Sequence, residues 1–257
     1  MIKLDSFEPL FGSWFDFFKP FLQTKAFEDI FIDLKSRANR GKIIFPYSST
    51  LQKKCPKWKG SNTMFRCFKE TDISSLKVVF VGLSPYYTIV DGKPIADGLA
   101  FSTHSKPLPP SLEAFYNGVE ADVYNGLNLN MERSPSLQFL AKQGVLLMNS
   151  ALTCEPQMPT VHTELWQPFM EYFFKKLNNT FSNLDIVFFG EEAQQYAKFI
   201  AEQTNLEFPF PNQHYIYKIA HPSFYARSAE IMKTDIFSQL TKKHGIYWDT
   251  IESQPPF

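Results

Sequence analysis

Residues 76–87 read LKVVFVGLSPYY, and this stretch decides the class of fold. Its first half is a short, unbroken apolar run, which is typical of a strand buried on both faces of a parallel sheet. Its second half contains Gly82 and Pro85, two residues that favour turns. We therefore interpret residues 76–81 as a buried strand and residues 82–87 as the loop that leaves its carboxyl end.

Three further apolar runs of this kind follow, at residues 145–148 (VLLM), 186–189 (IVFF) and 215–219 (YIYKI). Helical patterns separate the four runs, at residues 111–118, 163–178 and 191–203. Ser111 and Thr163 stand where the caps of the first two helices are expected. This alternation predicts an α/β fold, a three-layer sandwich with a central four-stranded, mostly parallel sheet and helices on both faces. Ligands of such sheets bind beyond the carboxyl ends of the strands.

The N-terminal part, residues 1–40, carries apolar side chains at helical spacing, and Pro20 should divide it into two helices. Residues 51–65, LQKKCPKWKGSNTMF, are polar, basic and rich in turn residues, and we expect them to form a surface loop. No internal repeat or low-complexity tract interrupts the sequence. We therefore expect residues 1–257 to form one domain, with residues 51–65 as an insertion.

Composition limits what this domain can be. The chain has 26 basic and 26 acidic residues, so a contact with nucleic acid must come from local clusters of charge. Most of the 27 phenylalanines are expected to fill the core. Three scattered cysteines, Cys55, Cys67 and Cys154, fit neither a disulfide framework nor a zinc site, so we expect reduced thiols and no metal.

The N-terminal sequence MIKLDSFEPLF has neither the basic start nor the apolar run of a signal peptide. No stretch approaches the roughly 18 apolar residues that a membrane span needs. These features favour a place in the cytoplasm or at the nucleoid, or in the host-cell cytoplasm if a virus encodes the protein.

Five short motifs lie at or between the expected strand ends. They read GLSPYY at 82–87, GLAFS at 98–102, PLPPS at 107–111, NSALT at 149–153 and HPSFYA at 221–226. Each alone is typical of an ordinary turn or helix cap. Their order and spacing together resemble the uracil-DNA glycosylases of the family-1 type, whose first motif reads GQDPYH and whose last reads HPSPLS. The resemblance runs from about Gly41 to Asp249.

This resemblance implies a hydrolase that flips a uracil nucleotide out of DNA and cleaves the bond between base and sugar. DNA, single- or double-stranded, would be the partner, no cofactor would be needed, and we expect a monomer. Phe101 matches the ring that stacks on the flipped base, and Asn149 matches the amide that reads the edge of uracil. Tyr86 matches the wall that excludes the methyl group of thymine. His221 matches the donor to uracil O2 as negative charge grows there.

The same resemblance implies a DNA-binding surface. Pro109, Pro110 and Ser111 match a loop that compresses the DNA backbone. Gly190 and Ser223 match two further backbone contacts. Tyr225 matches the leucine that fills the space left by the flipped base. Glu191 replaces a serine of the family beside Gly190. A carboxylate facing a phosphate is unfavourable.

The first motif departs from the family at three positions. Ser84 replaces the aspartate that activates the attacking water, Leu83 replaces a glutamine whose position can act through its backbone, and Tyr87 replaces a histidine. One interpretation is a slow glycosylase for uracil or a related modified pyrimidine, with water held by Ser84 or by Asp91 or Asp97. The other is an impaired homologue that serves as a DNA-binding or partner-binding scaffold. Retention of the base-reading residues favours the enzyme.

Overall fold

A computed structural model describes residues 4–46, 63–126, 131–202 and 213–250. Its centre is a four-stranded sheet in the order β4-β1-β5-β6, with every neighbouring pair parallel. The strands are β1 (Val78–Gly82), β4 (Val145–Asn149), β5 (Asp185–Phe189) and β6 (Tyr215–Ile219). All four correspond to the apolar runs, so the predicted fold class is confirmed.

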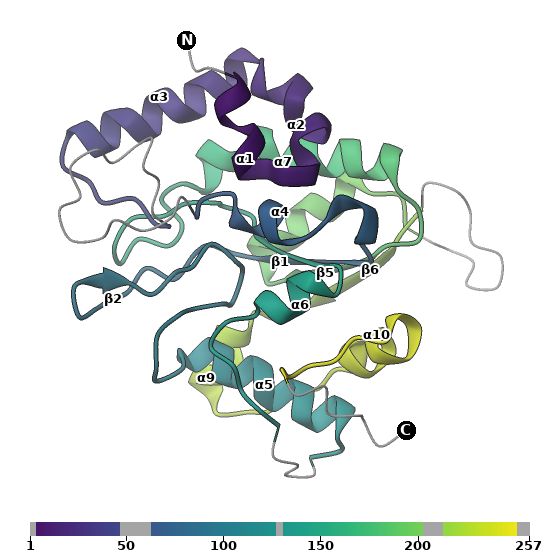
Figure 1. Cartoon of the computed structure of the whole chain (residues 1–257). Coiled ribbons are helices and arrows are strands. Elements are labelled where there is room, and N and C mark those ends of the chain that lie inside the picture. Colours follow the sequence, from purple (N-terminus) through teal and green to yellow (C-terminus); the bar gives the residue numbers. More distant parts are fainter. Residues whose placement is uncertain (1–3, 47–62, 127–130, 203–212, 251–257) are drawn as a thin grey trace.

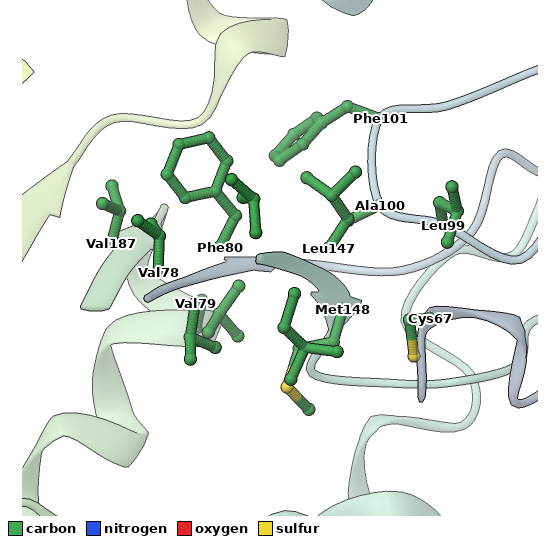
Figure 2. Packing of buried hydrophobic residues seen from close by; sticks show 14 of the residues in the cluster. Cys67, Val78, Val79, Phe80, Leu99, Ala100, Phe101, Leu147, Met148 and Val187 are labelled. Carbon is green, nitrogen blue, oxygen red and sulfur yellow. The ribbon is translucent and has the colours of Figure 1, made fainter. Parts of the chain in front are cut away.

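Helices cover both faces of the sheet (Figure 1). One layer contains α1 (Glu8–Phe11), α2 (Phe15–Leu22), α3 (Lys25–Asn39), α4 (Arg66–Glu70) and α7 (Thr163–Thr180), and the other contains α5 (Pro110–Val123), α9 (Pro222–Ser228) and α10 (Ile236–His244). The short helices α6 (Gln138–Lys142) and α8 (Glu191–Gln194) lie beside the strands that they precede or follow. Figure 2 shows how the strands serve both layers, with Phe80 and Phe101 on one side of β1 and Val79 and Met148 on the other. This alternation is what a strand buried on both faces requires.

The N-terminal helices divide at a different place from the one predicted. Pro20 lies inside α2, whereas the break falls after Leu22, where the Thr24 side chain accepts a hydrogen bond from the Phe27 backbone N–H and caps α3. Proline has the dihedral angle of a helix and removes only one hydrogen bond from this short element. The cap therefore decides where the new helix begins.

Two further helix starts and one helix end also differ from expectation. Pro109, not Ser111, precedes the first residue of α5, and no side chain caps this end. His162 stands at the corresponding place before α7, whose first residue is Thr163. The segment expected as one helix over 191–203 is α8 followed by a 3-10 helix, Gln195–Phe199. Its last residue, 203, lies outside the described residues.

The predicted loop at 51–65 is wrong at its end. Met64 and Phe65 are 1% and 2% exposed and belong to the core. Residues 51–62 of this stretch, including Cys55, lie outside the described residues. Because the stretch as a whole is polar, its composition did not indicate that the two apolar residues at its end are buried.

The aromatic side chains form a large cluster between the N-terminal helices and α7. Phe18 is its centre, fully buried and stacked on Phe169 with ring centroids 4.9 Å apart and an interplanar angle of 13°. Phe11 and Phe68 pack on the same ring at 4.8 Å and 4.7 Å. The prediction that phenylalanine fills core volume therefore holds for this layer.

Phe18→Ala should lower the free energy of unfolding by about 3–5 kcal/mol, because the substitution leaves a cavity among rigid rings. Ile32→Ala on α3 is the matched control, since Ile32 is 53% exposed, and it should cost less than about 0.5 kcal/mol. Urea denaturation of both variants measures the difference. Equal midpoints would show that the cluster does not support the fold.

Candidate active site

The strand register brings two of the motifs together. Gly82 and Asn149 end neighbouring strands and are direct partners across the β1–β4 pair. A side chain at Gly82 would place its Cβ 2.6 Å from Asn149 Oδ1 and 3.2 Å from Phe101 Cζ. Glycine is required at this strand end because Asn149 and Phe101 both lie against it.

Phe101 is held by a loop with its own internal anchor. Asp97 is 6% exposed, pairs with Arg66 at 2.8 Å and accepts hydrogen bonds from the Leu99 N–H at 3.1 Å and the Ser102 hydroxyl at 2.6 Å. Asp97 is therefore neither a solvated turn residue nor a carboxylate available to a water molecule. It fixes the loop that leads into Phe101.

The Phe101 ring lies in a group of three aromatic neighbours. It stacks on Phe115 with ring centroids 5.9 Å apart, meets the edge of Phe189 at 4.8 Å, and lies 5.5 Å from the His221 ring. Phe101 is 6% exposed and its φ is 62°, a conformation that non-glycine residues adopt only where the surrounding contacts hold them. These contacts fix the orientation of the ring.

Tyr86 connects this group to the start of α5. Its hydroxyl donates to the Phe101 carbonyl at 3.0 Å, so it accepts from the Ser111 hydroxyl, also at 3.0 Å. Burial raises the pKa of the Tyr86 phenol, which keeps it a donor. Ser111, which was expected to cap α5, instead orients Tyr86. Pro109 and Pro110 lie directly before Ser111 and start the helix.

The protonation state of His221 is fixed by its neighbours. Its Nδ1 accepts a hydrogen bond from the Ser223 backbone N–H at 3.2 Å, and the Ser223 hydroxyl lies 2.9 Å from the same nitrogen. Burial, and then the positive charge of Arg227, lower the pKa of His221 to about 4. The neutral imidazole therefore carries its proton on Nε2, where it can donate. A Cβ at Gly190 would lie 3.1 Å from His221 Cβ, so Gly190 gives the histidine its place.

Asn149 differs from these residues because its side-chain amide has no hydrogen-bond partner within the part of the chain that the structure describes. It is nevertheless only 6% exposed. Its amide atoms are not among the fully buried side-chain atoms that lack a partner, so solvent reaches them at the edge of the site. The amide is free to pair with a ligand.

The three residues that depart from the family pattern in the first motif make fewer contacts within the candidate site. The Ser84 hydroxyl has one distant contact, 3.5 Å from the Pro85 carbonyl. The Leu83 carbonyl accepts from the Ala151 N–H and from the Ser150 hydroxyl, which ties the loop to the end of β4. Tyr87 is 42% exposed.

The inserted stretch after Tyr87 forms a hairpin of β2 (Ile89–Val90) and β3 (Lys93–Pro94), which projects from the body of the molecule (Figure 1). Asp91 occupies its turn with a φ of 50° and is exposed. Asp91 is therefore a solvated turn residue.

Gly190 and Tyr225, two of the predicted DNA contacts, lie at the start of α8 and within α9. Glu191 follows Gly190 as the first residue of α8 and is exposed. Tyr225 of α9 is half-buried against the core, whereas its neighbour Phe224 is 48% exposed. Phe224 and the supporting roles of Asp97 and Phe115 carry no local sequence signal and were not predicted.

A cavity of about 460 Å³ lies elsewhere, lined by Lys77, Lys142, Gln143 and Tyr247 among others. Lys77 and Gln143 stand before β1 and β4, so this cavity is at the amino end of the strands, away from His221. Within the described ranges, no group of three or more His, Cys, Asp or Glu side chains could hold a metal ion. None of the helices described there is both long and apolar enough to cross a membrane.

The lowered pKa of His221 makes a prediction about acid stability. An unfolded chain binds a proton at this histidine near pH 6.5, whereas the folded chain binds it only near pH 4. The imidazole therefore contributes stability at neutral pH that is lost as the pH falls from about 6.5 towards 4. His221→Gln should flatten this part of the stability profile, measured as urea midpoints at several pH values. His214, whose pKa burial also lowers to about 4, titrates in both proteins. An NMR-measured pKa of His221 at or above 6.5 would contradict the prediction.

Comparison with known proteins agrees with this arrangement. The model of the uracil DNA glycosylase superfamily matches residues 68–243. A uracil-DNA glycosylase of Blochmanniella floridana is 31% identical over 230 residues, which cover 86% of this chain and 91% of the relative. One of Campylobacter jejuni subsp. doylei is 30% identical over 245 residues, which cover 93% of each. The crystal structure of mimivirus uracil-DNA glycosylase superposes with a TM-score of 0.69 at 26% identity, over 87% of this chain and 72% of that one. The chain therefore belongs to the uracil-DNA glycosylase superfamily.

Proposed function

We propose that this protein removes uracil, or a related modified pyrimidine, from DNA by hydrolysing the bond between base and deoxyribose. The observation that carries the proposal is the unpartnered amide of Asn149, which lies with Phe101 at Gly82, while the other end of the group is the His221 ring, 5.5 Å from Phe101. A base can reach such a site only after it is flipped out of the stack.

The site supports recognition of the uracil edge. An amide offers one acceptor and two donors, so Asn149 can donate to O4 and accept from N3–H of the same base. The Phe101 ring, held from behind by Phe115, can stack on the face of the base. Tyr86 is fixed through its hydroxyl to Phe101 and Ser111, and its rigid ring would meet a methyl group at C5 of thymine.

His221 supplies the chemistry that the site retains. When the bond between C1′ and N1 breaks, its electron pair moves onto the base, and negative charge grows on O2. A neutral imidazole with its proton on Nε2 donates a hydrogen bond to that oxygen. Donors fixed in advance toward developing charge contribute about 3–4 kcal/mol in comparable sites. Water then adds to C1′, its proton passes to solvent, and the uracil anion takes up a proton from solvent.

The weak point of the site is the activation of this water. Ser84 can hold a water molecule but has no charge to stabilise the cationic sugar and is a poor base near neutral pH. Asp97 is committed to Arg66 and Ser102. Losing a positioned general base typically costs about 10²–10⁴-fold. We therefore propose slow catalysis, with the cation stabilised in part by the DNA phosphates.

Because Ser84 is a poor base, the site also fits a second candidate function, a scaffold that binds DNA or a protein partner without cleaving the glycosidic bond. An unpartnered amide and a donor histidine serve no purpose in such a scaffold. For this reason the enzyme is the better interpretation of the site.

Ser84→Asp should raise the rate of uracil release at least about tenfold, because a carboxylate both accepts a proton and stabilises the cationic sugar. The measurement is single-turnover release of uracil from a defined oligonucleotide at matched salt and pH. Asn149→Ala is the control for specific binding and should weaken binding of the uracil-containing strand by about 1–3 kcal/mol. A fast parent that Ser84→Asp slows would show a different mechanism. Binding without release by either protein would favour the scaffold.

Tyr86→Ala should admit thymine, because the wall against its methyl group is removed. Tyr86→Phe is the matched control, since it keeps the ring and loses only the two hydrogen bonds of the hydroxyl. It should continue to reject thymine, with some loss of rate as the Phe101 loop loosens. Release of thymine and uracil is compared for the three proteins. If Tyr86→Ala removes uracil and still rejects thymine, the discriminating wall lies elsewhere.

A further inference from the structure

Helix α9 presents an aromatic ring and a cation to solvent directly beside His221. Phe224 is 48% exposed and is the only phenylalanine in the exposed class among the described residues. Arg227 is exposed as well, and no ion pair is found for it within the described part of the chain. A single exposed ring is ordinary on a protein surface, so its position beside His221 and Arg227, and not its exposure alone, is what points to a ligand.

These two side chains share one face of the helix. Phe224 lies in the first turn, where its backbone N–H donates to the His221 carbonyl at 2.8 Å. Arg227 follows three residues later, a spacing that makes two side chains neighbours on a helix surface. The face that carries them is therefore continuous with the candidate active site.

Tyr225 occupies a different position from Phe224. It is half-buried and packs against the core, and α9 itself packs on α5. Its ring meets the Phe224 ring edge to face, with centroids 5.3 Å apart and an interplanar angle of 86°. Tyr225 therefore supports the Phe224 ring from the protein side.

We propose that Phe224, rather than Tyr225, is the ring that stacks on a DNA base next to the flipped nucleotide, and that Arg227 pairs with a neighbouring phosphate. The inference rests on the proposed function, because it assigns the surface that holds the DNA around the site. A flat apolar ring beside a guanidinium matches a base beside its phosphate. This assignment revises the expectation that Tyr225 fills the space left by the flipped base.

Two matched substitutions separate the roles of the neighbouring rings. Phe224→Leu and Tyr225→Leu each keep apolar volume and remove a ring that could stack. The probe is a duplex with 2-aminopurine, whose fluorescence reports stacking, next to 2′-fluoro-2′-deoxyuridine, whose glycosidic bond resists cleavage. Dissociation constants and fluorescence are measured together, with Ile32→Ala as the control on a distant exposed site.

We expect Phe224→Leu to weaken binding about tenfold and to abolish the fluorescence change that the parent produces. Tyr225→Leu and Ile32→Ala should keep that change. Arg227→Gln should leave the stacking signal in place and reduce the slope of log affinity against log salt by about 1. Unchanged melting temperature of Phe224→Leu would exclude misfolding as the cause, and Phe224→Trp should restore the signal.

The opposite pattern, with the signal kept in Phe224→Leu and lost in Tyr225→Leu, would overturn the assignment. Release of uracil from an ordinary uracil duplex is measured with the same preparations. A parent that shows the Phe224-dependent signal yet releases no uracil would refute the proposed hydrolysis while upholding this contact.

Discussion

The site depends on the parallel pairing of β1 with β4. That register sets Gly82 opposite Asn149, so the loops that leave both strands start from one edge of the sheet. A shift of one residue would turn the Asn149 side chain to the other face of the sheet. Because Gly82 has no side chain, the Asn149 amide and the Phe101 ring can approach the strand end together. This close approach requires a glycine in the backbone, whatever chemistry the Asn149 and Phe101 side chains perform.

Around this point, a second residue holds each of three side chains of the candidate site. Asp97 anchors the Phe101 loop, Ser111 orients Tyr86, and Ser223 fixes the tautomer of His221. Groups oriented in advance lose little entropy when a ligand arrives and need no rearrangement as charge develops. Under the proposed function, the site would keep the groups that stabilise the leaving base, whereas only Ser84 would remain to position the water. Stabilisation of the anion would be kept and stabilisation of the cation would be weakened.

Much of the fold could be predicted from short-range patterns. The four strands were found because a strand buried on both faces needs an unbroken apolar run, and the sequence contains four of them. The convergence of Asn149 and His221 followed from the geometry of parallel sheets, in which all carboxyl ends lie at one edge. The helix boundaries were less accurate. Pro20 was expected to break a helix that instead ends at Leu22, since competing caps differ by about 1 kcal/mol and the local sequence does not rank them.

The sequence by itself determined the class of fold, the edge that carries the site and the family, because each depends on apolar runs and on motifs that are local in the chain. Only the tertiary structure decided which polar groups are free. Asp97 was a candidate for holding water until its partner Arg66 appeared from a segment about thirty residues away. Phe224 and Tyr225 are adjacent aromatic residues that the sequence cannot rank, yet one is exposed and the other packs on the core. Burial and pairing arise from contacts between distant segments, and these exist only once the chain has folded.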